Sequence, residues 1–443
     1  MKKYINIIIE KVKSKPIHYS LLLLSLLIIF LNAYFVLDSW GRKLLLFMGA
    51  DEPVWIDNAI KYFHEGKGSP YSHVPLFHDL IIPFVTGMFF SFETGYIVWK
   101  ILLFVVSSIL FFYIIYKISN LWIGFLFTVH YELMLNFVSF PSYSILAMIF
   151  FLLALSIIIQ NKNNIGIAFG ILLIGGLVRL ELILFGIIFF ILSAVFFYKL
   201  VFSKKFIYQV SVPIIIFIAL IYWHGSSITS FPKDYLFRGN QSSVWYVIDY
   251  MYYKGYFKKY TDAGRGNIPM DVLDKVLEEN FGKNLEGLNN SSFIEMYRAN
   301  PKIIKDRYKK MVGELPGLLA SNFFVKIPYK DMRGLYIDIF FIAGLLPFFL
   351  LFFSIKFFKQ ARTFNIISRY NSFITSNKKI SGVLIIIVLA SFAGFIPWMM
   401  TKPMEHYTIM ALPSFYIIIV LFLYLICSLI NKLFGGFTIS SGT

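Results

Sequence analysis

The chain has 443 residues, of which 58% are hydrophobic and 19% aromatic, and its mean hydropathy is +0.71. A soluble domain of that composition would expose too much apolar surface, so the composition predicts an all-α polytopic membrane protein. The net charge of +17 does not indicate nucleic-acid binding, because most basic residues lie in loops beside apolar spans, where they meet anionic lipid. The single cysteine, Cys427, excludes an intrachain disulfide and a cysteine-based metal site.

The N-terminal segment is basic. Residues 1–17 contain five lysines and one acid, Glu10, which predicts a cytoplasmic N-terminus. No small-residue cleavage site follows the first apolar span, so we expect that span to remain as an anchor. The next loop, from Asp38 to Pro75, has five acids against four basic residues and therefore fits an external location.

The apolar runs predict about ten transmembrane helices with both chain ends in the cytoplasm. Residues 76–92 are apolar but interrupted by Asp79, Pro83 and Gly87, so we interpret them as a juxtamembrane helix in the outer leaflet. If they do not span, every later loop obeys the positive-inside rule, including the basic loop 356–379. The expected spans are 18–37, 95–116, 120–138, 142–160, 164–178, 181–200, 206–224, 335–355, 381–400 and 405–430.

These spans divide the chain into three parts. Residues 1–224 form an N-terminal transmembrane catalytic module with the external loop 38–92, residues 225–334 an external and largely helical segment, and residues 335–443 the C-terminal transmembrane helices. Within the middle segment, Pro301 is expected to begin the main helix. In the stretch 292–315, apolar side chains recur at helical spacing: Phe293, Met296, Ile303, Ile304, Tyr308 and Met311.

The first external loop contains the polar stretch best suited to chemistry. Asp51 and Glu52 precede Pro53 and a short amphipathic helix expected from Val54 to Glu65. The alternative is that Asp51 only caps this helix at the bilayer surface. Asp51 with His64, His73 and His78 offers ligands for a divalent metal, but no spacing among them is diagnostic, and we predict no cofactor.

Two further polar segments follow. Arg179 and Glu181 come after the paired glycines 175–176, and they form either a local salt bridge or snorkelling pair, or a site where the arginine contacts a phosphate oxygen. The segment Thr401–Tyr407, followed by Pro413, is expected to be an external turn between the last two spans. Its side chains suit sugar or phosphate binding, although turn chemistry also explains them: Lys402, His406 and Tyr407.

The expected spans themselves carry few ionisable residues. The residues at outer span ends are Lys100, Arg179, Glu181 and Asp338, and His130 and Glu132, inside the span 120–138, are the exceptions. A proton- or ion-coupled transporter places carboxylates or broken helices near the midplane. Here the polar residues gather at the external face, which favours a site at the outer membrane–water boundary and a substrate delivered by lipid.

In this order and on this side of the membrane, the three segments resemble the GT-C superfamily, membrane glycosyltransferases that use polyprenyl-phosphate sugars, of the mannosyltransferase or aminoarabinose-transferase kind. The family's first-loop motif is matched by Asp51-Glu52, Ala59, Gly66, Pro70-Tyr71, Pro75-Leu76 and Pro83. Val178-Arg179-Leu180-Glu181 resembles its arginine–acid turn, and His406-Tyr407 with Pro413 resembles its late Arg-Tyr motif, with His406 in place of the arginine. The resemblance covers roughly residues 20–200 and 380–430; residues 225–334 match nothing.

The resemblance implies roles for particular residues. Asp51 would be the general base that deprotonates an acceptor hydroxyl, so that the oxygen displaces polyprenyl phosphate with inversion, and Glu52 would orient the acceptor or stabilise the loop. Arg179 would stabilise the leaving phosphate together with a second cation from among Lys326, Lys330, Arg333 and Lys402. The remaining residues expected to bind substrate are Tyr71, His73, Glu181, His406 and Tyr407.

The resemblance also implies partners and a location. The donor would be a polyprenyl-phosphate-linked sugar, and the acceptor a lipid, a glycan or a protein. The protein would contact membrane lipids, with its active site on the extracytoplasmic side of a prokaryotic plasma membrane. Two other functions fit the same residues: a transporter or flippase of lipid-linked sugars, and a non-catalytic subunit of cell-envelope assembly that would tolerate loss of Asp51.

Overall fold

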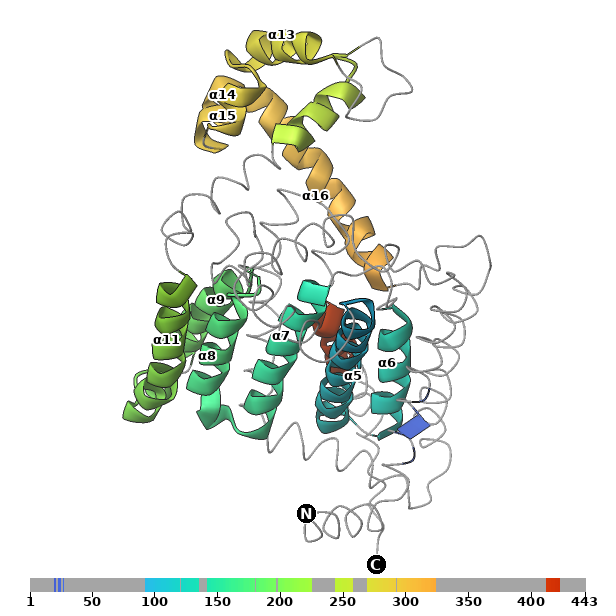
Figure 1. Cartoon of the computed structure of the whole chain (residues 1–443), viewed down its shortest axis with the longest axis vertical. Coiled ribbons are helices and arrows are strands. Elements are labelled where there is room, and N and C mark those ends of the chain that lie inside the picture. Colours follow the sequence, from blue (N-terminus) through green and yellow to red (C-terminus); the bar gives the residue numbers. More distant parts are fainter. Residues whose placement is uncertain are drawn as a thin grey trace, which may run out of the picture.

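The computed structural model describes the following residues: 20, 23, 24, 27, 92–119, 121–134, 142–179, 181–196, 198–224, 244–257, 269–291, 293–323 and 412–422. Across these ranges every regular element is a helix, and none is a strand (Figure 1). The expected all-α class is therefore confirmed for the described part of the chain. Asp51, Glu52 and the rest of the first external loop lie outside it.

One group of helices forms a bundle. Its long helices are α5 (Phe92–Ile118), α6 (Leu121–Met134), α7 (Ser142–Gln160), α8 (Ile165–Gly175), α9 (Glu181–Phe196) and α11 (Lys204–His224). Two short elements, η2 (Lys162–Asn164) and α10 (Tyr198–Val201), connect them. The helix Leu412–Phe422 joins this bundle from far along the chain, and its buried residues pack into the same hydrophobic core.

The helix boundaries follow the expected spans closely, with two differences. α7 occupies the residues of the expected span 142–160. The expected span 164–178 ends as a helix at Gly175 and continues as a turn, and the expected span 181–200 is divided between α9 and α10. Paired glycines explain the first difference, because glycine weakens a helix end and permits a tight turn.

The length and hydropathy of the described helices bear on whether they could cross a membrane. One segment there, Val98–Ile118, is long and apolar enough to cross a bilayer. Four other apolar helices are shorter: Ser144–Gln160, Ile165–Gly175, Phe185–Val195 and Leu412–Phe422. By length and composition alone, these helices hint at membrane association.

Close packing of α8 against α11 depends on two glycines one helical turn apart. A Cβ atom built on Gly170 would lie 2.3 Å from Cγ of Pro213, and one on Gly166 would lie 2.8 Å from Cβ of Gln209. Because real Cβ atoms do not approach that closely, only glycine lets the two helices touch here. Small residues at such spacing are the usual means by which helices pack tightly in membranes.

A second group of helices has a hydrophobic core of its own. It consists of the helical residues 244–253, α13 (Met270–Phe281), α14 (Leu285–Asn289), α15 (Phe293–Ala299) and α16 (Pro301–Phe323). We call the described residues 244–257, 269–291 and 293–323 the cap. Its core is built by apolar residues from every one of these helices, among them Ile248, Leu277, Leu288, Met296 and Ile304.

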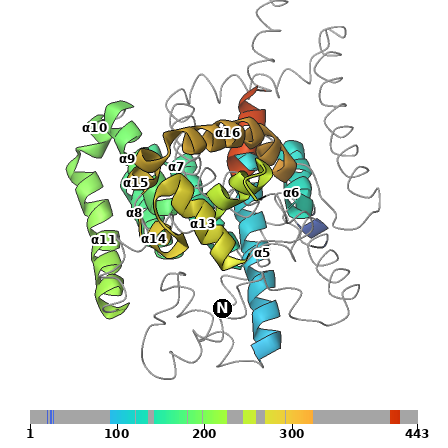
Figure 2. The ribbon, with the colours of Figure 1, turned by 90° about the horizontal axis from the view of Figure 1, so that it is seen from above.

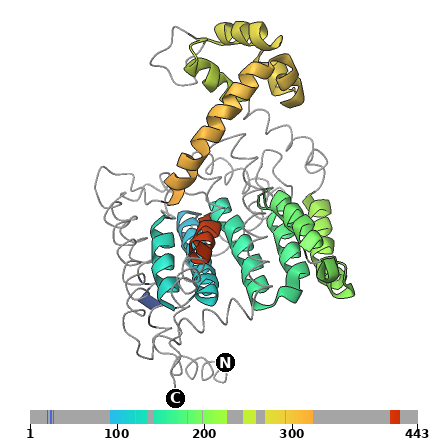
Figure 3. The ribbon, with the colours of Figure 1, turned by 180° about the vertical axis from the view of Figure 1, so that it is seen from behind.

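α16 is the cap helix that extends toward the bundle. Figures 1 and 3 show it descending from the other cap helices to the end of the bundle opposite the α7–η2–α8 connection, and Figure 2 shows the cap above the bundle. α16 begins at Pro301, as predicted, and the Asn300 side chain caps it by accepting a hydrogen bond from the Ile303 N–H at 3.2 Å.

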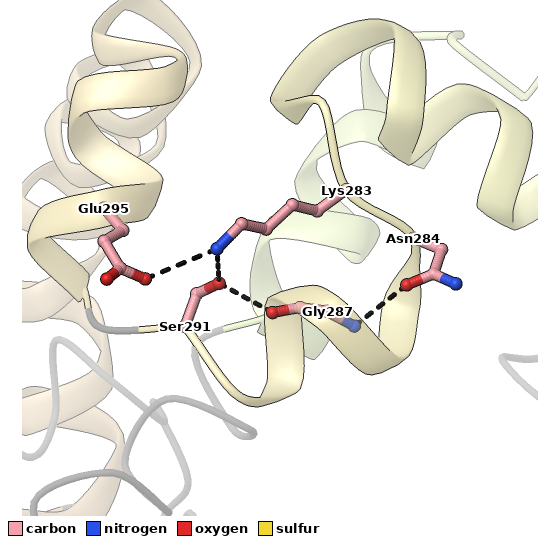
Figure 4. A network of polar contacts seen from close by, with 5 residues as sticks. All are labelled: Lys283, Asn284, Gly287, Ser291 and Glu295. Atoms are coloured by element: carbon pink, nitrogen blue, oxygen red, sulfur yellow. Dashed lines mark hydrogen bonds and ion pairs between the residues drawn. The ribbon is translucent and has the colours of Figure 1, made fainter.

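A polar network joins α14 to α15 (Figure 4). Lys283 donates to the Ser291 hydroxyl at 2.7 Å and pairs with Glu295 at 3.5 Å. Ser291 in turn donates to the Gly287 carbonyl at 2.6 Å, and Asn284 caps α14 by accepting from the Gly287 N–H at 2.9 Å. The lysine thus holds the turn between two short helices that would be marginal in isolation.

The cap core contains one arginine. Arg307 of α16 is buried, and its guanidinium carbon lies 5.2 Å from the ring centroid of Tyr308 and 5.8 Å from that of Tyr246. Burial lowers the pKa of the guanidinium from its usual value. Stacking on aromatic faces suits a flat, delocalised cation, so Arg307 packs as a core residue.

Candidate functional site

Among the described residues of the bundle, the buried basic and acidic side chains are Lys100 (1% exposed), His130 (2%), Glu132 (0%) and Arg179 (5%). Lys100 lies in the first half of α5, and His130 and Glu132 lie in the second half of α6. These helices are antiparallel neighbours, because only residues 119 and 120 separate them. Arg179 follows α8, close to the start of α7. These residues therefore approach the same end of the bundle, the end that α16 reaches in Figure 1.

We call this set, with Ser144 and Tyr416, the polar end of the bundle. In a bilayer, buried ionisable residues are costly and usually functional. In a soluble interior they are also rare unless they are paired. The polar end is therefore the strongest candidate site in the described part of the chain.

The turn after α8 places Arg179 inside the bundle. The N–H of Arg179 donates to the Gly175 carbonyl at 3.0 Å, and the Arg179 carbonyl accepts from the Leu182 N–H at 3.0 Å. A Cβ on Gly176 would lie 2.1 Å from Cγ1 of Ile183, so the paired glycines let this turn pack onto α9. The glycines thus fix the backbone that presents the arginine.

The Arg179 side chain is held from a second helix. Its Nη1 donates to the Ser144 hydroxyl at 2.7 Å, near the start of α7. A snorkelling arginine would extend toward the surface, whereas this one is 5% exposed, so the snorkelling interpretation is wrong. Glu181 begins α9, but its side chain lies outside the described part, so a salt bridge between the two remains a prediction.

A histidine–tyrosine contact brings the C-terminal segment to this end of the bundle. Nδ1 of His130 lies 2.7 Å from the hydroxyl of Tyr416, a residue 286 positions later in the chain. The Tyr416 ring meets Phe111 edge-on, with centroids 5.0 Å apart, and Tyr131 stacks on the other side of the cluster, 4.1 Å from Phe111. Aromatic packing therefore fixes the tyrosine that contacts His130.

Lys100, which the sequence placed at an outer span end, is buried. Its side chain is 1% exposed, inside the bundle. The neighbouring Trp99 is also buried, and its Nε1–H donates to no acceptor in the part of the chain that the structure describes. A buried donor without an acceptor loses the free energy of hydration, so such a group commonly marks a place where a ligand or water binds.

The charges of the polar end favour an anionic ligand. Lys100 and Arg179 are cations, Glu132 is the carboxylate among the buried residues, and His130 supplies a further ring nitrogen. An arginine held in place by a second helix presents planar N–H donors that match the oxygens of a phosphate or carboxylate. The arrangement can thus hold an anionic group.

Most of the residues that the sequence suggested lie outside the described part: Asp51, Glu52, Tyr71, His73, Lys326, Lys330, Arg333, Lys402, His406 and Tyr407. Their roles remain predictions. No group of three or more possible metal-ligating side chains occurs among the described residues. The sequence did not single out Trp99 or Tyr416 as site residues, and it placed Lys100 only at a span end. A lysine within the apolar run of α5 was a usable signal for a role of Lys100 in the site.

The chain was also compared with known proteins. No family model, no curated protein and no solved structure matches it. Any proposal about its function therefore rests on its own residues.

Proposed function

We propose that this chain is a polytopic membrane glycosyltransferase of the GT-C kind, with about ten spans and an extracytoplasmic active site. It moves a sugar from a polyprenyl-phosphate donor to an acceptor hydroxyl with inversion. Asp51 is the general base, and Arg179 contacts the donor phosphate. The buried position of Arg179 is the observation that carries the proposal.

Arg179 supports the proposal because its surroundings suit an anion at the outer end of the spans. Its hydrogen bond to Ser144 keeps the guanidinium in place, so little side-chain entropy is lost when a phosphate binds. Lys100 adds a second buried cation on α5, and the indole N–H of Trp99 has no acceptor among the residues that the structure describes. A lipid-linked phosphate enters such a site from the side of the bilayer.

The chemical step needs a base and a stabilised leaving group. The carboxylate of Asp51 takes the proton of the acceptor hydroxyl, and the oxygen forms a bond to the anomeric carbon. The bond from that carbon to the phosphate oxygen breaks, and its electron pair leaves with polyprenyl phosphate. A positioned base contributes roughly 10²–10⁴-fold. Fixed cations at the leaving phosphate stabilise the charge that develops there.

The test measures transfer from a panel of radiolabelled polyprenyl-phosphate sugars in membranes that contain the wild type or a variant. We expect Asp51→Asn to lower kcat by about 10²–10⁴-fold, because asparagine has the same shape but cannot accept the proton. Equal transfer by the wild type and Asp51→Asn, at equal expression, would show that another residue is the base.

The role of Arg179 has a matched test. Arg179→Ala should weaken donor binding by about 10–100-fold, the range expected when a charge-assisted hydrogen bond is lost. Arg298→Ala removes an exposed arginine of α15 and should leave donor binding unchanged. Unchanged donor affinity in Arg179→Ala would refute its contact with the phosphate.

A second function is supported by the number of ionisable groups in the polar end. A flippase or transporter of lipid-linked sugars also needs buried charges along its path. It would move the labelled lipid between the leaflets of a vesicle and form no new glycosidic bond. Asp51→Asn would then leave lipid movement unchanged, whereas Glu132→Gln would reduce it.

A further inference from the structure

The charges of the cap are divided between its two halves. α13, α14 and their connections carry mainly acids: Asp271, Asp274, Glu278, Glu279 and Glu286. α15 and α16 carry mainly bases: Arg298, Lys302, Lys305, Arg307, Lys309 and Lys310. With Arg307 inside the core, the other bases remain for the outer surface.

Three lysines share one side of α16. Lys302, Lys305 and Lys309 are exposed, whereas Ile304 and Met311 are buried in or against the cap core. At 100° per residue the three lysines fall within about 60° of one another, opposite the buried side of the helix. We call Lys302, Lys305 and Lys309 the basic face; it extends for about 10 Å along α16.

Exposed tyrosines border the basic face. Lys305 lies 5.8 Å from the ring centroid of Tyr297 on α15, and Tyr297 is partly exposed. On the other flank of α16, beyond the exposed Asp306, Nζ of Lys310 lies 3.7 Å from the ring centroid of Tyr253, which is 67% exposed. An exposed aromatic ring beside an ammonium group offers both an apolar plane and a cation to one ligand.

The backbone after Tyr253 is fixed by a glycine. Gly255 has a φ of +80°, and its N–H donates to the Tyr252 carbonyl at 2.9 Å. The next N–H, that of Tyr256, donates to the Met251 carbonyl at 3.1 Å. This pair of bonds is the Schellman helix end, which requires a left-handed residue at the glycine. Tyr253 and the exposed Tyr256 are therefore presented by an ordered turn.

A membrane surface is a poor partner for the basic face. α16 descends to the bundle at its C-terminal end, whereas the three lysines lie in its N-terminal half (Figures 1 and 3). Lys309 is 14 residues before Phe323, or about 21 Å along the axis. The attraction of anionic headgroups fades over about 8–10 Å at physiological salt, so lipid at the bundle would scarcely reach these lysines.

We propose that the basic face and its bordering tyrosines bind an anionic glycan, a chain of sugars that carries carboxylate or phosphate groups. The lysines attract the anionic groups, and the tyrosine rings pack against the apolar faces of the sugars. That this glycan is the acceptor of the transfer reaction is the part that rests on the proposed function. The binding itself depends only on the cap.

The test uses the full chain in nanodiscs of neutral lipid and two fluorescent probes, an oligogalacturonate and a phosphorylated oligomannoside. Binding is followed by fluorescence anisotropy. The methyl ester of the first probe and the unphosphorylated form of the second are the neutral controls. We expect one or both anionic probes to bind more tightly than its neutral form, and the preferred probe identifies the anionic group.

A triple variant, Lys302→Gln, Lys305→Gln and Lys309→Gln, should bind the preferred probe about tenfold more weakly, because three exposed ion pairs each contribute modestly. Lys275→Gln removes an exposed lysine from α13 and should change nothing. Tyr253→Leu should weaken both charged and neutral forms. All of these side chains lie on the surface, so the variants should melt at the temperature of the wild type.

Three results would overturn the proposal. The first is that neither anionic probe binds. The second is that the triple variant binds the preferred probe as tightly as the wild type does. The third is that the basic face binds anionic lipid vesicles while neither probe binds. Asp51→Asn should bind the probes as the wild type does. Probe binding without any sugar transfer would therefore refute the proposed enzyme while leaving the glycan-binding surface intact.

Discussion

The bundle and the cap distribute their side chains in opposite ways. In the bundle, α11 exposes a row of large apolar residues, including Ile207, Ile215 and Ile218, while Lys100 and Glu132 are buried. In the cap, apolar residues such as Leu277 and Ile304 are buried, and α16 exposes lysines. The cap also has exceptions to this rule: the buried Arg307, with its guanidinium stacked on tyrosines, and the exposed Ile294 and Val312.

From this difference we propose that the two parts meet different solvents. An exposed row of isoleucines is unfavourable in water and neutral in lipid, whereas exposed lysines are favourable only in water. The comparison supports a membrane around the bundle and water around the cap. The following predictions test it, from the largest expected effect to the smallest.

A charge in the cap core should unfold the cap alone. Leu277 is fully buried in α13, and Leu277→Asp loses its packing and buries a carboxylate without a partner. We expect a loss of more than about 4 kcal/mol of cap stability. Limited proteolysis should then cleave the cap, and the cap amides should exchange with solvent, while the bundle stays protected in both measurements. Val312→Asp, at an exposed position of α16, is the control, and simultaneous loss of both parts would show that the two cores are not independent.

A matched pair of substitutions compares the two surfaces directly. Ile215 of α11 is 64% exposed and Ile294 of α15 is 60% exposed. If lipid covers α11, Ile215→Asp should cost about 2.5–3.5 kcal/mol, the usual cost of an aspartate at the centre of a membrane helix. Ile294→Asp lies in the first turn of a helix in water and should be neutral or slightly favourable.

The measurement is the fraction of folded, membrane-extracted protein after size-exclusion chromatography. Equal effects at the two positions would contradict the assignment of lipid to one surface and water to the other.

Glycine should be needed at the α8–α11 contact and dispensable in the cap. Gly170→Ala places a Cβ against the Pro213 ring, and such overpacking costs about 1–3 kcal/mol. In the described part of the chain, nothing beyond its own helix and chain neighbours lies within 4 Å of the Cβ position of Gly313 on α16, so Gly313→Ala should stabilise that helix by up to about 1 kcal/mol. Thermal unfolding in detergent, followed by intrinsic fluorescence, should show a lower melting temperature for Gly170→Ala and a higher one for Gly313→Ala. A stabilising Gly170→Ala would show that the helices pack less closely.

The His130–Tyr416 hydrogen bond should have the smallest effect. Tyr416→Phe keeps the ring and its aromatic contacts but removes the hydroxyl, at a cost of about 1 kcal/mol. A double-mutant cycle with His130→Phe should give a coupling of similar size between the two positions. Tyr131→Phe, which removes a hydroxyl that contacts the Met148 sulfur and not His130, is the control. Additive effects would show that the two side chains do not interact.

Local features of the chain were predictable where local physics decides them. The expected span 142–160 coincides with α7, because a long apolar run favours one helix whatever packs around it. Pro301 begins α16 because proline lacks the N–H that a first helical residue leaves unused. The paired glycines indicated the turn before Arg179, because glycine weakens a helix end and permits a tight turn.

Burial was not predictable from the same residues. The topology placed Lys100 at a span end, but nothing in the neighbouring sequence showed that its side chain would be buried. The snorkelling interpretation of Arg179 failed for the same reason, since Ser144 of another helix provides its hydrogen bond. Sequence patterns show which face of a helix is apolar, but not which polar group a neighbouring helix will cover.

The sequence by itself therefore determined the helical class, most helix boundaries in the described part, and the polar segments that resemble a glycosyltransferase. These depend on hydropathy and backbone preference over a few neighbouring residues. Only the tertiary structure brought Tyr416 to His130 and placed Lys100 and Arg179 at one end of the bundle. It also divided the helices between two cores, because contacts between distant residues depend on how every helix packs against the others.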